Sequence, residues 1–514
     1  MNFNHITTIC LVAALTGFTA TAQATTKTNK TNPNFKMADV ITKTVSNLPS
    51  EADLDKYTKK IENQRHPANA GLTPSEDLMS SKMIAFRNAF ISARKGSDVN
   101  NLFKKLEADY AAFEKSAEFT DEKYNDYKYF AARVLPFRKM AGYVWRMVPA
   151  VEDGKIRASQ EALLAAIRNI AEEVKIHAPN SHNEAIFRFV TEPQEGYLTR
   201  FHNESDVQAF YLESIAPEIA LAIDRIDKMD LTKPIVLDER LRFGDVSFPD
   251  SNEKRFRLIG EAEKSEVLAR MSRRMASVLT FTAYDFTDYL KIRRDMGKKQ
   301  GIDVMFASHI GGLTREARKD IMKSYPAFGV KKSTGDVAMK NAYFYLYLEA
   351  YFLNASFSTL THEESNDNWL LEPEVILSRS KVEAKSLKKM LELTKFALPK
   401  HATEDSTVTL NSALTGETVR VNLKAYFYNP PANLQDLMPT DFEKGPEYFT
   451  GTPACPTCKY RNYFYGRAIG WDQNAYKTLF PDLTSGKDVA HFQDVLSEAR
   501  GGRVVANFFA PLVR

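Results

Sequence analysis

Residues 73–90, TPSEDLMSSKMIAFRNAF, show most clearly how this chain folds. The tetrapeptide TPSE at 73–76 has the composition of a helix start: a capping residue, proline in the first turn and an acid three residues after the cap. Behind it, apolar side chains recur at steps of four, three and four: Met79, Met83, Phe86 and Phe90. This period predicts a helix with one apolar face to bury.

The same period recurs along the chain to about residue 400. Two further apolar faces comprise Leu163, Ile167, Ile170 and Val174, and Leu268, Met271, Met275 and Val278. We therefore predict a mainly α fold, with an irregular multi-helix body over residues 38–400. The stretch KPIVLDERLRFGDVSF at 233–248 breaks the period and predicts a short β excursion. A division of the body into two subdomains, with a break near 231–253, is one interpretation of it.

The character of the sequence changes near residue 401. Residues 407–410 and 418–428 have the β-branched content of strands and are joined through Leu-Thr-Gly at 414–416, which predicts a β-hairpin. A capped helix is expected over 485–500, stopped by two glycines. We predict that residues 401–514 form a small mixed α/β C-terminal domain.

The first 24 residues have the organisation of a signal peptide. An apolar run from Ile6 to Ala20, too short to span a bilayer, precedes the small-x-small site Ala22-Gln23-Ala24, although the segment before the run has no Lys or Arg. We expect cleavage after Ala24, a flexible polar leader at 25–37, and a mature protein in the periplasm or outside the cell. No later stretch reaches the length of a transmembrane segment, so none is expected in the mature chain.

Composition and charge are those of an ordinary globular protein. The 514 residues are 44% hydrophobic and 26% charged, with 69 basic against 65 acidic side chains. A nucleic-acid-binding protein would show a larger basic excess, so we expect no nucleic-acid partner.

Cys455 and Cys458 are the cysteines that remain after cleavage. In an oxidising compartment such a pair predicts a disulfide. The surrounding Gly451, Pro453 and Pro456 favour a loop, and so a structural clip; a redox site would place the pair at a helix start. Haem attachment needs a histidine at 459 and zinc a second cysteine pair, neither of which is present. The clip is the first interpretation and redox activity stays open.

Catalytic candidates are concentrated at 361–366, THEESN. His362 and Glu363 match the start of a zinc-protease helix, but Asn366 stands where the second histidine is needed. Acidic residues beside an aromatic residue are typical of a glycan hydrolase active site, and Glu363 or Glu364 would be its general acid. A solvated acidic loop between two helices is the simpler interpretation. Further acids and an aromatic follow in the same tract: Asp367, Trp369 and Glu372.

Three other patterns have a functional and a structural interpretation. Two His-Asn-Glu copies at 182–184 and 202–204, with His177 nearby, could converge on a metal, but loop histidines more often form hydrogen bonds. Tyr343, Tyr347 and Tyr351 could stack on sugars, but this spacing in an apolar helix favours the core. The basic run at 291–299 favours a solvated helix end over a site for anionic glycan or lipid. We predict no metal and no cofactor.

No nucleotide-binding or serine-hydrolase motif is present in the sequence. We therefore favour a non-enzymatic role: an exported soluble binding or scaffold protein acting through surface contacts with a protein or glycan partner in the envelope or outside the cell. The alternative is an envelope-acting hydrolase, most plausibly on glycan, that uses the carboxylates of Glu363 and Glu364.

Overall fold

The computed structural model describes a helical protein, with helices accounting for 66% of the described residues. These residues are 51–65, 72–147, 182–241, 255–289, 291–292, 295, 320–360, 368–370, 407–411, 416–437, 440–442, 448–452, 455–461, 468–489, 491–492 and 495. The expected signal peptide and leader lie outside them, as does the apolar face at 163–174. The predicted mainly α fold with a β-hairpin is confirmed.

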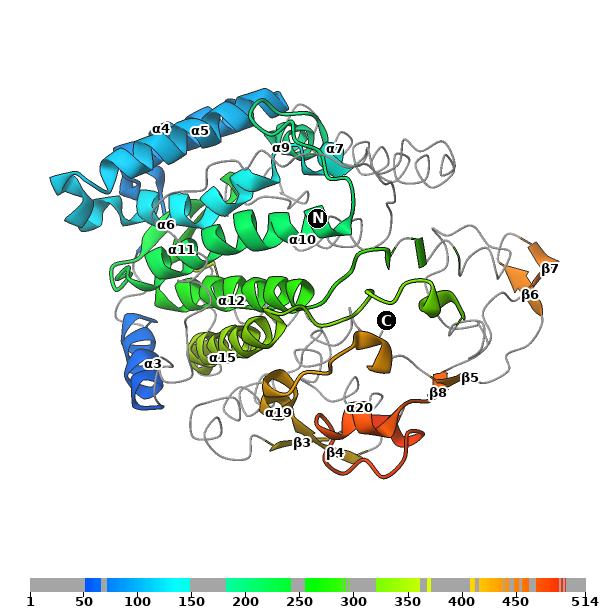
Figure 1. Cartoon of the computed structure of the whole chain (residues 1–514). Coiled ribbons are helices and arrows are strands. Elements are labelled where there is room, and N and C mark those ends of the chain that lie inside the picture. The colour runs from blue at the N-terminus through cyan, green and yellow to red at the C-terminus, as the bar shows by residue number, and fades with distance from the viewer. Residues whose placement is uncertain are drawn as a thin grey trace.

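The helices form a stack, with α5, α11, α12 and α15 following one another across the body (Figure 1). Helix α12 packs against both α11 and α15. The α-helices are α3 (Glu51–Arg65), α4 (Ser81–Ser92), α5 (Gly96–Phe113), α6 (Asn125–Val134), α7 (Tyr143–Met147), α9 (His182–Thr191), α10 (Glu204–Phe210), α11 (Ala216–Asp227), α12 (Glu261–Ala283), α15 (Gly335–Leu360), α19 (Leu423–Tyr428) and α20 (Gln473–Lys477). Shorter helices are η3 (Glu76–Leu78), η4 (Ala117–Thr120), η5 (Glu122–Tyr124), η6 (Leu135–Met140), the π-helix η8 (Tyr211–Ile215), η9 (Glu239–Leu241) and η12 (Leu434–Leu437).

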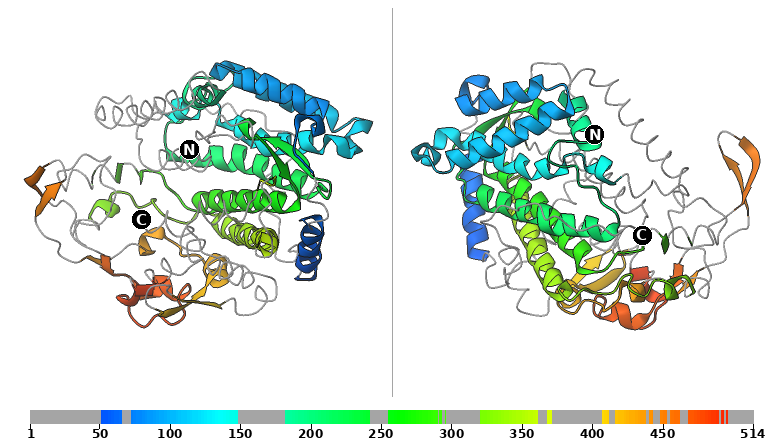
Figure 2. Two further views of the ribbon diagram at one scale, coloured as in Figure 1. Left: turned by 180° about the vertical axis from the view of Figure 1, so that it is seen from behind. Right: turned by 45° about the horizontal axis from the view of Figure 1, so that its top comes forward.

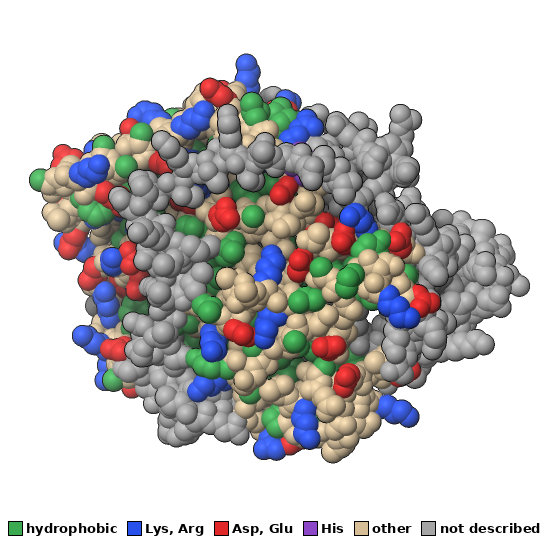
Figure 3. Space-filling view, viewed as in Figure 1, with side chains coloured by type: hydrophobic (Ala, Val, Ile, Leu, Met, Phe, Trp, Pro, Cys, Tyr) green, Lys and Arg blue, Asp and Glu red, His purple; other side chains and the backbone are tan. Residues whose placement is uncertain are grey.

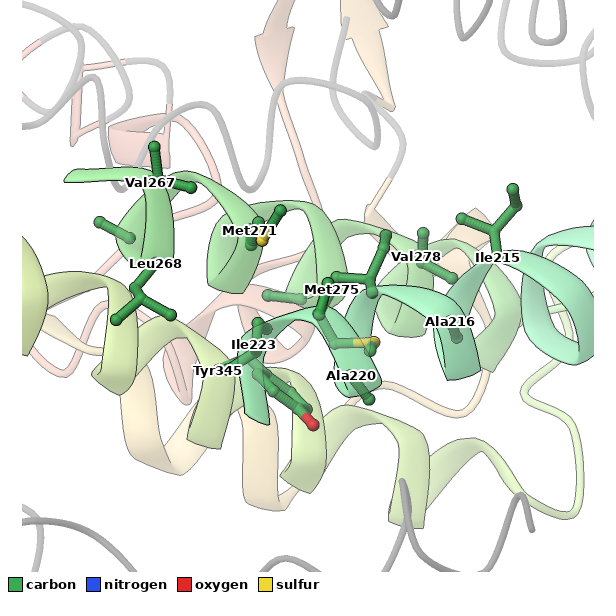
Figure 4. Close-up of a cluster of buried hydrophobic side chains, with 14 of the residues drawn as sticks. Ile215, Ala216, Ala220, Ile223, Val267, Leu268, Met271, Met275, Val278 and Tyr345 are labelled. Atoms are coloured by element: carbon green, nitrogen blue, oxygen red, sulfur yellow. The ribbon is translucent and has the colours of Figure 1, made fainter. Parts of the chain in front are cut away.

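The middle of the stack is the hydrophobic core. The predicted face of α12 is fully buried, with Leu268 and Met275 at 0% exposure. Figure 4 shows these side chains in one cluster with residues of η8 and α11 and with Tyr345 of α15. Burial of each such side chain contributes roughly 1.5–3 kcal/mol, so α12 organises the body.

Helix α4 begins later than the sequence predicts. The apolar face is confirmed, because Met79, Met83, Phe86 and Phe90 are all buried. The helix starts at Ser81, however, and Ser80 caps it by accepting a hydrogen bond from the Met83 N–H at 3.2 Å. The carboxylate of Asp126 on α6 holds Ser80 in place, accepting from its N–H at 2.6 Å and its hydroxyl at 2.7 Å. This tertiary contact overrides the local signal at 73–76.

Four antiparallel strand pairs complete the described fold: β1 (Ile235–Asp238) with β2 (Phe256–Ile259), β3 (Thr407–Asn411) with β4 (Thr418–Asn422), β5 (Asp441–Phe442) with β8 (Ala468–Gly470), and β6 (Tyr448–Thr452) with β7 (Cys455–Arg461). The predicted β excursion at 233–248 contains β1, and its partner β2 was not expected. The predicted hairpin is β3–β4, with Thr407 opposite Asn422. Figure 2 shows β6–β7 projecting from the periphery of the molecule.

Two predictions about the C-terminal part are wrong. Residues 423–428 form helix α19 and not strand, because the Asn422 side chain caps the helix by accepting from the Ala425 N–H at 2.8 Å. Its Phe427 is buried against Tyr343 of α15, with ring centres 6.0 Å apart. The cysteine pair, expected in a loop, lies in strand β7.

The C-terminal residues attach to the body through backbone contacts. The Lys331 N–H donates to the Ala432 carbonyl at 2.8 Å, and the Tyr284 hydroxyl donates to the Pro431 carbonyl at 3.0 Å. The domain boundary near 400 and the break near 231–253 stay predictions. Among the described helices, none is long and apolar enough to cross a membrane.

Candidate functional site

The catalytic candidates His362, Glu363 and Glu364 lie outside the described residues. The end of their tract is described: the Leu258 N–H donates to the Asn368 carbonyl at 2.7 Å, and the Leu370 N–H donates to the Leu258 carbonyl at 2.9 Å. These bonds fasten 368–370 to strand β2. Trp369, the aromatic expected beside the acids, is buried at 4% exposure.

The strand structure of 455–461 bears on the predicted disulfide between Cys455 and Cys458. A strand rises about 3.3 Å per residue, so Cα atoms three positions apart are separated by about 10 Å. A disulfide bridges Cα atoms up to about 7 Å apart, so the bond would require β7 to bend. The disulfide stays a prediction. Alkylation of the unreduced protein tests it: blocked thiols support the clip, and two alkylated cysteines support a regular strand.

The two His-Asn-Glu copies act at helix starts where they are described. Glu184 in the first turn of α9 pairs with Arg188 at 2.9 Å. Asn203 caps α10, and the His202 backbone N–H donates to the Asp206 carboxylate at 2.7 Å. In the described ranges, no three side chains of His, Cys, Asp or Glu come together as metal ligands.

The tyrosine stripe on α15 belongs to the core, as its spacing favoured. Tyr343, Tyr347 and Tyr351 are between 1% and 6% exposed. In the basic run, Lys291 forms an ion pair with Asp288, and most of the remaining residues lie outside the described part.

The structure assembles one group that the sequence does not predict, around Arg146 on α7. Arg146 is 7% exposed, and its Cζ lies 4.3 Å from the ring centre of Phe201 and 4.6 Å from that of Phe210. Its Nε–H donates to the Thr199 carbonyl at 2.9 Å. Tyr143 completes the aromatic wall, 5.9 Å from Phe201 and 5.7 Å from Phe210. We call Arg146, Tyr143, Tyr197, Phe201 and Phe210 the Arg146 site.

Local chain geometry positions Arg146. Gly142, just before α7, has a φ of +59°, and a Cβ there would lie 3.0 Å from the Glu192 carbonyl oxygen. Only glycine adopts this conformation readily and permits the approach to the end of α9. The Gly142 N–H donates to the Phe189 carbonyl at 2.8 Å, and the Phe201 N–H donates to the Arg146 carbonyl at 2.8 Å. Helix α7 is thereby fixed to α9 and to the loop at 197–201.

The π-helix η8 lies beside this site. Pro217, the second residue of α11, has no N–H, and its ring conflicts with the carbonyl four residues earlier in an α-helix. The chain widens there, and the Ala216 N–H bonds to the carbonyl of Tyr211, five residues earlier. The hydroxyls of Tyr211 and Tyr143 lie 3.1 Å apart in the interior. Single-turn π-helices of this kind are frequent at functional sites.

Arg146 is a buried cation without a carboxylate partner among the described residues. Burial lowers its pKa to about 10, opposed by the Tyr143 and Tyr197 hydroxyls. Two other poorly exposed arginines of the body have acidic partners. Arg225 pairs with Glu114 at 2.8 Å, and Arg138 pairs with Glu107.

Elsewhere, buried charges tie helices together, most clearly at Glu261, the first residue of α12. Its Oε1 accepts from the Leu231 N–H at 2.6 Å and from Lys60 at 3.2 Å, and its carboxylate lies 2.8 Å from the Lys264 Nζ. Its own N–H donates to the Gln64 side chain at 2.8 Å. These contacts join α3, α12 and the residues before β1.

A second buried carboxylate, Asp238 at the end of β1, is surrounded by arginines. It accepts from the Arg240 Nη2 at 2.7 Å and from the Arg255 Nη2 at 3.2 Å. Arg87 of α4 lies 3.7 Å away and also bonds to Glu76 at 2.8 Å. The cluster fastens the β1–β2 pair to α4 and η3.

Comparisons of the chain with family models, with curated proteins and with solved structures found no match. The functional argument therefore rests on the residues themselves. Of the buried charges described above, Glu261 and Asp238 are used in joining elements, whereas no carboxylate of the described residues neutralises the guanidinium of Arg146.

Proposed function

We propose that the protein is an exported binding or scaffold protein that acts through surface contacts with protein or glycan partners in the envelope or outside the cell. The observation that carries this proposal is the use of buried charges to join one helix to another. Glu261 joins α3 to α12, and Asp238 joins the β1–β2 pair to α4. A body cross-linked in this way keeps its surface in a fixed shape, as a scaffold requires.

The same principle extends through the stack of helices. Glu349 of α15 is 2% exposed and accepts from the Arg273 Nε on α12 at 2.6 Å. Arg225 of α11 reaches Glu114 at the end of α5 through two hydrogen bonds of 2.8 Å each. Because a partner then binds a preformed surface, little conformational entropy is lost on association.

The exposed face has mixed charge. Lys and Arg side chains are interspersed with Asp and Glu over the described part of the face in Figure 3. Such a surface favours a partner recognised by shape and by individual polar contacts rather than by a field of a single sign.

Affinity capture with cross-linking from the native cell tests this function. The tagged full-length chain should recover a defined envelope or extracellular component. The matched control is a variant carrying Glu261→Gln, in which the tie between α3 and α12 is broken. A wild-type protein that captures nothing beyond what the untagged strain gives would contradict the proposal.

A glycan hydrolase is the second candidate. It is favoured by the attachment of 368–370 to β2, which anchors one end of the acidic tract to the folded body. The test compares Glu363→Gln and Glu364→Gln with wild type in cleavage of cell-wall glycan. Cleavage by wild type that either change abolishes, at unchanged thermal stability, would favour the hydrolase over the scaffold. Absence of cleavage by wild type would remove it.

A further inference from the structure

We infer that the Arg146 site binds a carboxylate, and that its ligand is a monocarboxylate with an apolar or aromatic body. The inference starts from Arg146, a residue that is 7% exposed and whose guanidinium is bonded through Nε and covered by aromatic rings. It is independent of the scaffold function, because a scaffold could carry this site or lack it.

The geometry leaves one edge of the guanidinium for a ligand. The ring centres of Phe201 and Phe210 are 5.2 Å apart, and each is less than 5 Å from the Arg146 Cζ. Two rings on opposite faces of the guanidinium would have centres about as far apart as the sum of their distances to Cζ. The shorter separation of the ring centres places the two rings on adjacent sides of the guanidinium. Thr199 takes the Nε–H, and no described residue accepts from Nη1 or Nη2. Two parallel N–H groups at that edge match the two oxygens of a carboxylate.

Charge balance selects a single negative charge. An unpaired buried ion destabilises the fold, and a bound carboxylate would offset that cost. The nearby acid Glu218 lies 3.3 Å from Lys139 and 3.9 Å from Arg138, so it is already shared by two cations. Arg146 thus contributes one positive charge to be neutralised. A dianionic phosphate would leave one negative charge in an aromatic surrounding.

The walls of the site select an apolar body. Tyr143, Phe201 and Phe210 form a continuous aromatic cluster, and Tyr197 lies near enough to affect the charge of Arg146. Leu198, in the loop that Arg146 holds, is 60% exposed. A ligand whose carboxylate reaches Arg146 would place its remaining atoms against these side chains.

A structural role for Arg146 makes different predictions. If Arg146 serves to hold the loop at 197–201 through Thr199 and the two phenylalanines, its replacement lowers the melting temperature and no carboxylate affects the protein. If it binds a carboxylate, benzoate raises the melting temperature of the wild type and leaves that of Arg146→Met unchanged, whatever the melting temperature of the ligand-free variant.

The experiment uses the full mature chain with benzoate as probe, benzamide as the uncharged match and inorganic phosphate as the dianion. Melting temperature and Trp145 fluorescence report binding, since Trp145 adjoins Arg146 in α7 and is stacked with Arg200 at 4.3 Å. Benzoate should raise the melting temperature and change the fluorescence, saturating with a Kd of about 1 mM or tighter. Benzamide and phosphate should do neither.

Arg146→Gln should weaken benzoate binding by about tenfold or more. Arg146→Lys keeps the charge without the two parallel donors, and should fold and bind benzoate several-fold more weakly than wild type. Arg188→Gln, on the exposed face of α9, is the matched control and should bind as wild type does. The inference is overturned if wild type shows no benzoate response up to about 20 mM, if benzamide or phosphate binds as well, or if Arg146→Lys and wild type bind equally.

Discussion

Replacement of Glu261 by glutamine tests the idea that buried charges hold the helices together. Glu261 is 0% exposed, and two lysines pair with its carboxylate: Lys264, itself 3% exposed, and Lys60, which also pairs with Asp230 at 3.2 Å. Glutamine keeps the shape and can still accept from the Leu231 N–H, but it neutralises neither lysine. Removing one partner of a buried ion pair costs about 3–5 kcal/mol, so we expect a loss of about 3 kcal/mol in the free energy of unfolding.

Equilibrium unfolding in guanidinium chloride measures this loss. The control is Asp109→Asn, which breaks the exposed pair between Lys105 and Asp109 and should change stability by less than about 0.5 kcal/mol. The double variant Glu261→Gln with Lys264→Met should be less destabilised than the sum of its single changes, because the orphaned cation is gone. A loss below about 1 kcal/mol for Glu261→Gln, or strict additivity in the double variant, would refute the reasoning.

Three further predictions concern other parts of the chain. Burial raises the pKa of Glu349 above its usual 4.5, and Arg273 opposes this shift. The folded state therefore keeps a proton that the unfolded state has lost, and the free energy of unfolding falls as pH rises above about 4.5. Glu349→Gln should flatten this pH dependence in urea unfolding, and an unchanged pH dependence would contradict the prediction. Asn422→Ala removes the cap of α19 and should cost about 1 kcal/mol, read from the melting temperature. N-terminal sequencing of the exported protein should begin at Thr25, and a retained Met1 would end the argument for export.

The buried face of a helix could be predicted from the sequence, because apolar side chains that recur with the helical period define that face. The side chains at 268, 271, 275 and 278 repeat every three or four residues, and all four are buried in the core around α12. Such a face is buried whatever lies opposite, so no knowledge of the partner helices is needed. The same argument placed the α15 tyrosines in the core.

Element boundaries depend on contacts that a local pattern does not contain. The TPSE signal at 73–76 is a sound helix start by composition, yet α4 begins at Ser81 because Asp126, distant in sequence, binds Ser80. Residues 423–428 have aromatic content typical of a strand, yet they are helical because Asn422 caps them and α15 buries Phe427. At 73–81 a tertiary contact, and at 423–428 a side-chain cap together with a tertiary contact, outweighs a propensity of a few tenths of a kcal/mol per residue.

The Arg146 site could not be predicted from the sequence, because it too depends on contacts between residues that are distant in the chain. In the sequence, YVWRM at 143–147 offers one arginine among apolar residues, which a surface helix also presents. Arg146 differs from such a surface residue because the loop at 197–201 and the residues at the start of the π-helix η8 pack around it. They come together because Gly142, without a Cβ, allows the close approach of the end of α9, and because Pro217 widens the helix at η8. One signal was nevertheless readable: a helix with proline at its second position, preceded without a break by another helical pattern, must depart from α geometry. The aromatic pair Phe210 and Tyr211 stands at that departure, and in the fold Phe210 packs against Arg146.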